Sequence, residues 1–282
     1  MAALGSTNCI NEREQLMTHD DDLERFAEQG AVLPPPQVEG RVENDGASIW
    51  YAAFGAGFPV VLLHGGLGHA GNWAHQVPDL VAAGYRAVVV DSRGHGRSTR
   101  DERPFSYDLM ATDVLAVMDA LEMERAAFVG WSDGACTALA LARQAPERAA
   151  GVFFFACNVD PAGTKPFEPT PVIDRCFARH QKDYAALSPT PEAFGVLAED
   201  LQKMQASQPN YSARDLEAIG VPVTIVQAEF DEFIKREHAE YMARAIPGAE
   251  YVLLPQVSHF APIQRPDAFN AAVRAFMERV AA

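Results

Sequence analysis

The chain has 282 residues, 48% hydrophobic and 22% charged, which is enough for one large domain around a sizeable core. This composition excludes a mostly disordered chain. Lys and Arg number 23 against 38 Asp and Glu, and the resulting net charge of −15 repels phosphate backbones, so we expect no nucleic acid partner.

The sequence shows no membrane or export segment. Its most apolar run, 149–157, is about half the roughly 20 residues that a membrane-spanning helix needs. Residues 1–18 lack a basic stretch followed by an apolar stretch and a cleavage site, so we expect a soluble, cytoplasmic protein without a membrane partner. The cysteines lack metal-ligand spacing and are expected to be free, mostly buried thiols: Cys9, Cys136, Cys157 and Cys176.

Short apolar runs alternate with longer helical patterns from residue 38 onward. This alternation predicts an α/β fold, a mostly parallel eight-stranded sheet with helices on both faces. The expected strands are, in chain order, 39–44, 48–54, 59–63, 86–91, 126–131, 151–156, 221–228 and 250–254. The expected helices are 73–82, 106–121, 132–145, 234–245 and 266–280.

Residues 1–37 precede this alternation and are expected to form an N-terminal extension. Thr18 and Asp21 indicate the start of a helix, and Gly30 indicates its end. Met17 opens the more structured part of the extension and is an alternative start codon.

Residues 158–220 interrupt the alternation and divide the expected core into 38–157 and 221–282. They are rich in proline, with short helical patterns such as 191–207 and no convincing strand. An unstructured loop of this length is improbable in a compact domain, so we expect a helical cap, or lid, over the sheet. Its apolar residues are candidates for lining a pocket, although helical spacing favours core packing for most of them: Phe167, Ile173, Phe177, Tyr184, Phe194, Leu197, Leu201, Met204 and Tyr211.

The strongest chemical signal is Gly-Trp-Ser-Asp-Gly at 130–134. The pentapeptide follows an apolar strand and opens an alanine-rich helix, which matches the G-x-S-x-G nucleophile elbow. Its glycines permit a tight turn that projects the Ser132 hydroxyl above the sheet. The alternative is a serine that caps an ordinary helix. With the strand and the helix in place, we predict that Ser132 is a nucleophile.

A serine hydroxyl is a weak nucleophile at neutral pH and needs a base and a group that orients the base. His259 lies just beyond the last expected strand, and Asp231 lies beyond the strand before it. Both positions follow carboxyl ends of strands, on the same rim of the sheet as Ser132. We therefore predict a catalytic triad of these three residues. The rivals for the acid are Glu229, Glu232 and Asp160.

The run His-Gly-Gly-Leu-Gly at 64–68 directly follows the strand 59–63. Attack on a carbonyl develops an oxyanion, which preorganised backbone N–H groups stabilise. We predict an oxyanion hole from the N–H groups of Gly66 and Asp133, with Leu67 as the rival for Gly66. The alternative, a phosphate-binding loop, lacks the Gly-Lys-Ser/Thr continuation. His64 is expected to support the turn rather than to bind a metal.

These motifs, together with Asp-Ser-Arg-Gly-His-Gly-Arg-Ser at 91–98, resemble the α/β-hydrolase fold superfamily over residues 38–280. The resemblance implies a structural role for the 91–98 loop beside the site. The residues themselves agree, because the glycines permit a sharp exit from a strand and the charges of Asp91 and Arg93 are expected to stabilise the fold.

Within the superfamily, the pentapeptide at 130–134 is similar to that of valacyclovir hydrolase-like serine hydrolases. That likeness implies that the Asp133 carboxylate binds the α-amino group of aminoacyl esters. The alternative for this residue is a carboxylate that complements the helix dipole.

The sequence thus predicts an esterase-like serine hydrolase that forms an acyl-enzyme on a small carboxylic ester, including an aminoacyl ester or a lactone, without cofactor or metal. We expect Asp133, Trp131 and Leu67 to contact the substrate. Carbon–carbon bond hydrolases and perhydrolases of this fold also use serine and stay open as alternatives. A ligand-binding or signalling protein on the same scaffold is the alternative from another class, but it would not need to keep Ser132, Asp231 and His259 together.

Overall fold

The computed structural model describes residues 21–281. The expected helix start at Thr18, the alternative start at Met17 and the Cys9 thiol lie outside the described residues. Within them, no helix is both long enough and apolar enough to cross a bilayer.

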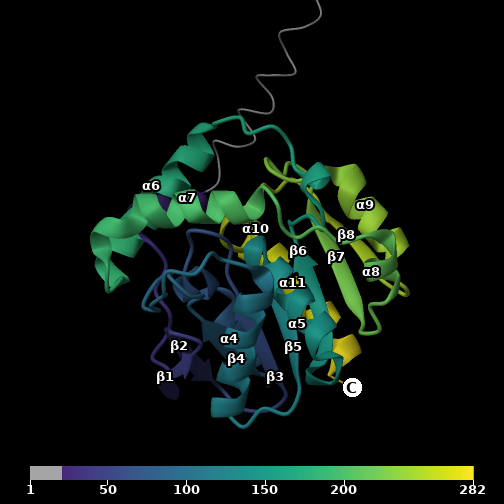
Figure 1. Ribbon diagram of the computed structural model, residues 1–282, viewed down its shortest axis with the longest axis horizontal. Helices are drawn as coiled ribbons and strands as arrows, with labels where there is room; N and C mark the ends of the chain where they lie inside the picture. The colour runs from purple at the N-terminus through teal and green to yellow at the C-terminus, as the bar shows by residue number, and fades with distance from the viewer. Residues whose placement is uncertain (1–20, 282) are drawn as a thin grey trace, which may run out of the picture.

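Eight strands form one sheet in the order β1-β2-β4-β3-β5-β6-β7-β8 (Figure 1). β3 to β8 run parallel, β2 pairs antiparallel with β4, and β1 pairs antiparallel with β2 at the edge of the sheet. The predicted fold class and all eight predicted strands are confirmed, with ends that differ by two residues at most. The strands are β1 Val38–Asn44, β2 Ala47–Phe54, β3 Pro59–Leu63, β4 Arg86–Val90, β5 Ala126–Trp131, β6 Ala149–Phe155, β7 Val223–Ala228 and β8 Glu250–Leu254.

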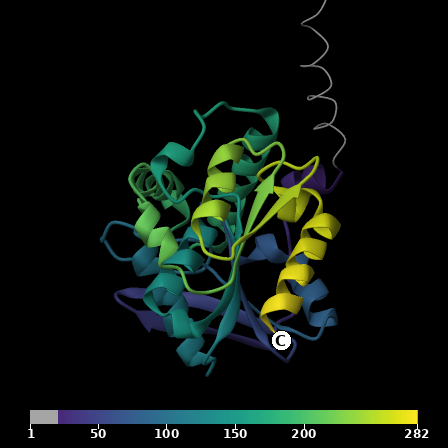
Figure 2. The same ribbon diagram turned by 90° about the vertical axis from the view of Figure 1, so that its right-hand side faces the viewer.

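Helices cover both faces of the sheet because its central strands are apolar on both sides (Figure 2). Neighbouring residues of β5 pack into different cores, Phe128 into one and Val129 into the other. The Phe128 core includes residues of α4 Tyr107–Ala120, α5 Asp133–Gln144 and α9 Arg236–Ala245. The Val129 core includes residues of α3 Gln76–Ala82, α10 Ala261–Gln264 and α11 Pro266–Val280.

Two predicted helices begin two or three residues later than the sequence indicated. The helix expected at 73–82 begins at Gln76, after a short 3-10 turn at Ala70–Trp73. The helix expected at 234–245 begins at Arg236, because Ile234 forms a β-bridge with Thr164 instead. Residues that the apolar spacing assigned to the helix thus belong to a local turn in the first case and to a tertiary contact in the second.

The region 158–220 contains helices and no strand of the sheet. α6 Pro171–Leu187 and α7 Phe194–Gln205 contact each other and lie across the top of the molecule in Figure 1. α8 Ala213–Glu217 instead packs against α9, and its Leu216 belongs to the Phe128 core. The cap boundaries at 158 and 220 stay a prediction, and α6 and α7 are the helices to which we apply the word cap below.

Helix α2 of the N-terminal extension packs against both the cap and the core. α2 Asp21–Gln29 ends at Gly30, which has a φ of +73°. Leu23 and Phe26 of α2 are buried, and the helix packs against α6 and α10. Since α10 begins two residues after His259, α2 links the cap to the segment that follows this histidine.

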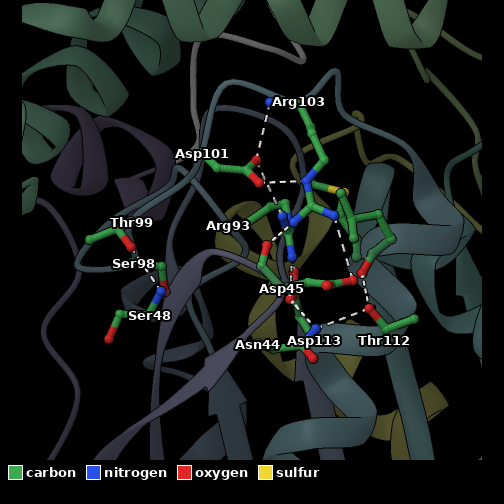
Figure 3. Close-up of polar contacts among 12 residues, drawn as sticks. Asn44, Asp45, Ser48, Arg93, Ser98, Thr99, Asp101, Arg103, Thr112 and Asp113 are labelled. Carbon is green, nitrogen blue, oxygen red and sulfur yellow. Dashed lines mark hydrogen bonds and ion pairs between the residues drawn. The ribbon is translucent and has the colours of Figure 1, made fainter.

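Buried charges hold the 91–98 loop (Figure 3). Arg93 donates to both carboxylate oxygens of Asp113, from Nε at 2.7 Å and from Nη2 at 2.6 Å. The Asp91 carboxylate accepts the N–H groups of Ala70 and Arg97, both at 2.7 Å. Hydrogen bonds of this kind offset the cost of burying charge, although Arg93 Nη1 has no hydrogen-bond partner in the described part of the chain and lies 3.9 Å from Asp101 Oδ1. The network fixes the loop beside the segment that follows His-Gly-Gly.

Candidate active site

Ser132 lies at a sharp turn between β5 and α5. Its backbone has φ 54° and ψ −123°, which side-chain-bearing residues rarely adopt. The turn also excludes side chains on either side of it. A Cβ at Gly130 would lie 2.4 Å from the Cα of Ala135, and a Cβ at Gly134 would lie 2.0 Å from the Leu63 carbonyl oxygen. Backbone strain of this kind persists where the surrounding structure holds it, often at functional sites.

The side chain of Ser132 does not serve as a helix cap. Ser132 occupies the N-cap position of α5, yet its hydroxyl makes no capping hydrogen bond to the described helix backbone. The residue instead lines a cavity of about 210 Å³ that His259 also lines. The alternative of an ordinary capping serine is therefore contradicted by the local geometry.

The imidazole of His259 faces the carboxylate of Asp231. His259 Nδ1 lies 3.1 Å from Oδ1 and 3.2 Å from Oδ2 of Asp231, and both side chains are buried. The carboxylate is itself oriented, because its Oδ1 accepts the backbone N–H groups of Phe233 and Ile234, each at 2.9 Å. The acid is thus fixed by its own loop and paired with the histidine.

The three rival carboxylates make other contacts. Glu229 accepts the N–H of Gln256 at 2.8 Å, and Asp160 caps the short 3-10 turn at Pro161–Gly163. Glu232 reaches His259 but accepts its backbone N–H, at 2.9 Å, rather than a ring nitrogen. Of the four carboxylates considered, Asp231 is the one that lies at the ring.

Two opposing effects act on the pKa of His259. Burial lowers this pKa, because the low-dielectric surroundings disfavour the imidazolium, whereas the nearby carboxylates of Asp231, Glu232 and Asp133 raise it. The carboxylates outweigh burial, so the pKa lies above the ordinary histidine value. The imidazole is thus a ready proton acceptor whose cationic form is stabilised.

The His-Gly-Gly-Leu-Gly run lies against the serine turn. Gly65, Gly66 and Leu67 line the cavity, and a Cβ at Gly65 would lie 3.2 Å from the Cβ of Ser132. His64 fixes the run, since its Nε2 accepts the N–H of Ser92 at 3.0 Å. Burial lowers the pKa of His64 to about 4, so the ring is neutral at pH 7 and able to accept this hydrogen bond.

Asp133 presents a buried carboxylate to the same cavity. The Tyr107 hydroxyl donates to its Oδ1 at 2.7 Å, and the Gln205 amide donates to its Oδ2 at 2.9 Å. No ion pair joins this carboxylate to a Lys, Arg or His anywhere in residues 21–281. Burial raises its pKa, and the two neutral donors offset only part of that effect. The carboxylate therefore lies in the cavity without a cationic partner.

Sequence reasoning missed Tyr107 and Gln205 as partners of Asp133. The contacts span 26 and 72 positions, and Gln205 comes from the cap helix α7, so no local pattern signals them.

Trp131, expected to contact substrate, lines the cavity with its ring centroid 6.1 Å from that of His259. Cys136, Cys157 and Cys176 are free and buried, as expected.

The apolar residues singled out in the region 158–220 divide as helical spacing suggested. Phe177 and Leu201 line the cavity. Phe167 is exposed. Most of the others are buried in the two cores, namely Ile173, Tyr184, Leu197 and Met204, and Phe194 and Tyr211 pack against one of them.

The order of serine, aspartate and histidine along the chain, each beyond the carboxyl end of a parallel strand, is that of an α/β-hydrolase fold. Comparison with known proteins gives the same class. The model of the alpha/beta hydrolase family matches residues 60–272, and the chain belongs to this family.

Several named relatives are hydrolases. Serine hydrolase BPHL of Mus musculus is 25% identical over 267 residues, 89% of this chain and 90% of that protein. The putative carbamate hydrolase RutD of Caulobacter sp. strain K31 is 30% identical over 79% of this chain and 91% of that protein. The solved structure of Est816, described as an N-acyl homoserine lactone degrading enzyme, is 29% identical with a TM-score of 0.66, over 84% of this chain and 99% of that one. The chain is a hydrolase, and its similarity to BPHL supports the resemblance to valacyclovir hydrolase-like enzymes.

Proposed function

We propose that the protein is a serine hydrolase that cleaves small carboxylic esters through an acyl-enzyme. Ser132 Oγ attacks the ester carbonyl carbon as His259 takes the hydroxyl proton, and Asp231 holds the imidazole tautomer and stabilises the imidazolium. The imidazolium then protonates the leaving alcohol. Water, activated by the same imidazole, releases the acid. The backbone N–H groups of Asp133 and of Gly66 or Leu67 stabilise the oxyanion.

The observation that supports this mechanism most strongly is the His259–Asp231 pair at the cavity that Ser132 lines. Because Nδ1 of His259 is engaged by the carboxylate, Nε2 is the nitrogen left to accept the serine proton. The strained turn at Ser132 supports the same role, since its hydroxyl is not used for capping.

A fluorophosphonate probe tests the nucleophile directly, because it phosphonylates activated serines. We expect one adduct per chain, on the peptide that contains Ser132, found by mass spectrometry of the digested protein. Heat-denatured protein is the control and should stay unlabelled. An adduct on another serine, or no adduct on folded protein, would contradict the mechanism and favour the ligand-binding alternative.

The Asp133 carboxylate supports a preference for a cationic acyl group, as in an aminoacyl ester. The carboxylate is buried at the cavity with two neutral donors and no ion pair within the described chain. A ligand ammonium beside it would supply the missing opposite charge through a charge-assisted hydrogen bond. Such a bond contributes about 1.5–3 kcal/mol.

Substituting this carboxylate tests the preference. We expect wild-type protein to favour an alanine ester over the matching propionate ester, and Asp133→Asn to reduce that ratio of kcat/KM about 10- to 100-fold. Asp200→Asn, which removes a cap carboxylate outside the cavity, is the matched control and should keep the ratio. A ratio unchanged by Asp133→Asn would remove this residue from substrate recognition while leaving the triad proposal intact.

A further inference from the structure

The leaving group of the proposed reaction must lie beside His259, and the inference that follows rests on that proposed function. The imidazole that accepts the Ser132 proton later donates it to the departing alcohol. The alcohol oxygen must therefore come within hydrogen-bond reach of the ring. Side chains packed against this ring consequently form the leaving-group side of the cavity.

Trp131, Phe233 and Phe260 pack against the His259 ring and line the cavity, and one further aromatic ring, that of Phe167, packs on Phe233. Phe233 lines the cavity and meets the His259 ring edge to face, with centroids 4.7 Å apart and an interplanar angle of 71°. Phe167 stacks on Phe233, with centroids 6.3 Å apart and planes inclined by 20°. Phe167 is 59% exposed, and it is the one aromatic ring among the four large exposed apolar side chains in residues 21–281. Phe167 does not itself line the cavity, and its exposed ring packs on Phe233, which does.

Backbone contacts hold the rings of Phe167 and Phe233 together. Thr164 forms a β-bridge with Ile234, and the N–H of Lys165 donates to the Phe233 carbonyl oxygen at 2.7 Å. The segment that leads to Phe167 is thus attached to the loop that bears Phe233. A site fixed in this way loses little conformational entropy when a ligand binds.

We propose that Phe167 and Phe233 form a subsite for an aromatic ring in the leaving group, so that the substrates are esters of aromatic alcohols such as arylmethanols. Stacked and edge-to-face aromatic pairs gain stability beyond the area they bury. The acyl part then lies toward Tyr107, Asp133 and Gln205, whose polar groups also bound the cavity.

The reaction balances without a co-reactant other than water. A bond forms between Ser132 Oγ and the acyl carbon as the bond from that carbon to the alcohol oxygen breaks. The alcohol leaves with the proton held by His259. Water then cleaves the acyl-enzyme, which releases the carboxylic acid and returns the proton to the serine.

Benzyl and cyclohexylmethyl esters of the same acid test the subsite, because their leaving groups match in size and differ in the aromatic face. We expect wild-type kcat/KM to favour the benzyl ester about two- to tenfold. Phe167→Leu keeps an apolar side chain without a ring and should bring that ratio close to one, chiefly through KM. Val196→Ala, at an exposed apolar residue of the cap helix α7, is the control and should keep the ratio.

The outcomes separate the subsite from the proposed function. If hydrolysis of both esters depends on Ser132 but the ratio is unchanged in Phe167→Leu, the subsite is wrong and the serine mechanism stands. If hydrolysis survives Ser132→Ala, the mechanism itself fails. Ligand-observed NMR of benzyl alcohol then tests the subsite without turnover. Wild-type protein should bind benzyl alcohol more strongly than cyclohexylmethanol, and Phe167→Leu should bind benzyl alcohol more weakly than wild type does. Equal binding of benzyl alcohol to wild type and Phe167→Leu would overturn the proposal.

Discussion

Replacing Ser132 by alanine is expected to lower kcat for ester hydrolysis by about 10⁶-fold, because removal of a triad serine leaves only the oxyanion hole and substrate binding to promote attack by water. Steady-state hydrolysis of short p-nitrophenyl esters measures this loss. Alanine and serine both carry a Cβ and are similarly strained at the φ of 54° of this turn. We therefore expect the substitution to preserve folding. Circular dichroism and a thermal melt check that it is.

The matched control is Ser207→Ala, which removes an exposed serine at the end of the cap helix α7. We expect wild-type kinetics from this variant. Activity of Ser132→Ala within tenfold of wild type would remove the nucleophile assignment, whatever the activity of the control.

Replacing Asp231 by asparagine is expected to lower kcat about 10⁴-fold, since the amide favours the wrong imidazole tautomer and no longer stabilises the imidazolium. The pH profile should change as well. In wild-type protein the neighbouring carboxylates raise the pKa of His259, so kcat/KM rises with pH as the ring loses its proton, with a midpoint above the ordinary histidine value. Without the Asp231 charge, burial has more weight, and the midpoint should move to lower pH.

Glu229→Gln is the control for this experiment. Glu229 lies on the same loop but accepts a backbone N–H of Gln256 and does not reach the ring, so its removal should change neither kcat nor the midpoint. A midpoint that stays in place or rises in Asp231→Asn would contradict the assignment of this residue as the partner of His259.

The strands were predictable because burial imposes a simple pattern on them. β3, β5 and β6 are almost entirely buried and consist of Val, Leu, Phe and Ala except for Pro59, Gly130, Trp131 and Gly151. The starts of α3 and α9 were less predictable. The apolar spacing continues on the N-terminal side of the observed helix starts, so it does not mark them. The bridge that excludes Ile234 from α9 joins it to Thr164, 70 positions away, and cannot be seen in the local sequence.

The positions of Ser132, Asp231 and His259 could be predicted for a related reason. Each follows a strand that the sequence marks clearly, and parallel strands bring their carboxyl ends to one rim. The sequence favoured Asp231 over its rivals Glu229, Glu232 and Asp160. In the structure, the backbone N–H groups of Phe233 and Ile234 turn the Asp231 carboxylate toward the histidine ring.

The sequence by itself determined the α/β architecture, the tight turn at 130–134 and the rim at which we propose that the chemistry occurs, because strand burial and glycine geometry are local properties of a chain. Only the tertiary structure decided what surrounds that rim. Gln205 and Tyr107 reach Asp133, and Phe167 reaches Phe233, from segments far apart in sequence. The Gln205 contact follows from how the cap helix α7 packs, and the other two follow from the packing of α4 and of the segment that bears Phe167. No residue pattern along the chain encodes that packing locally.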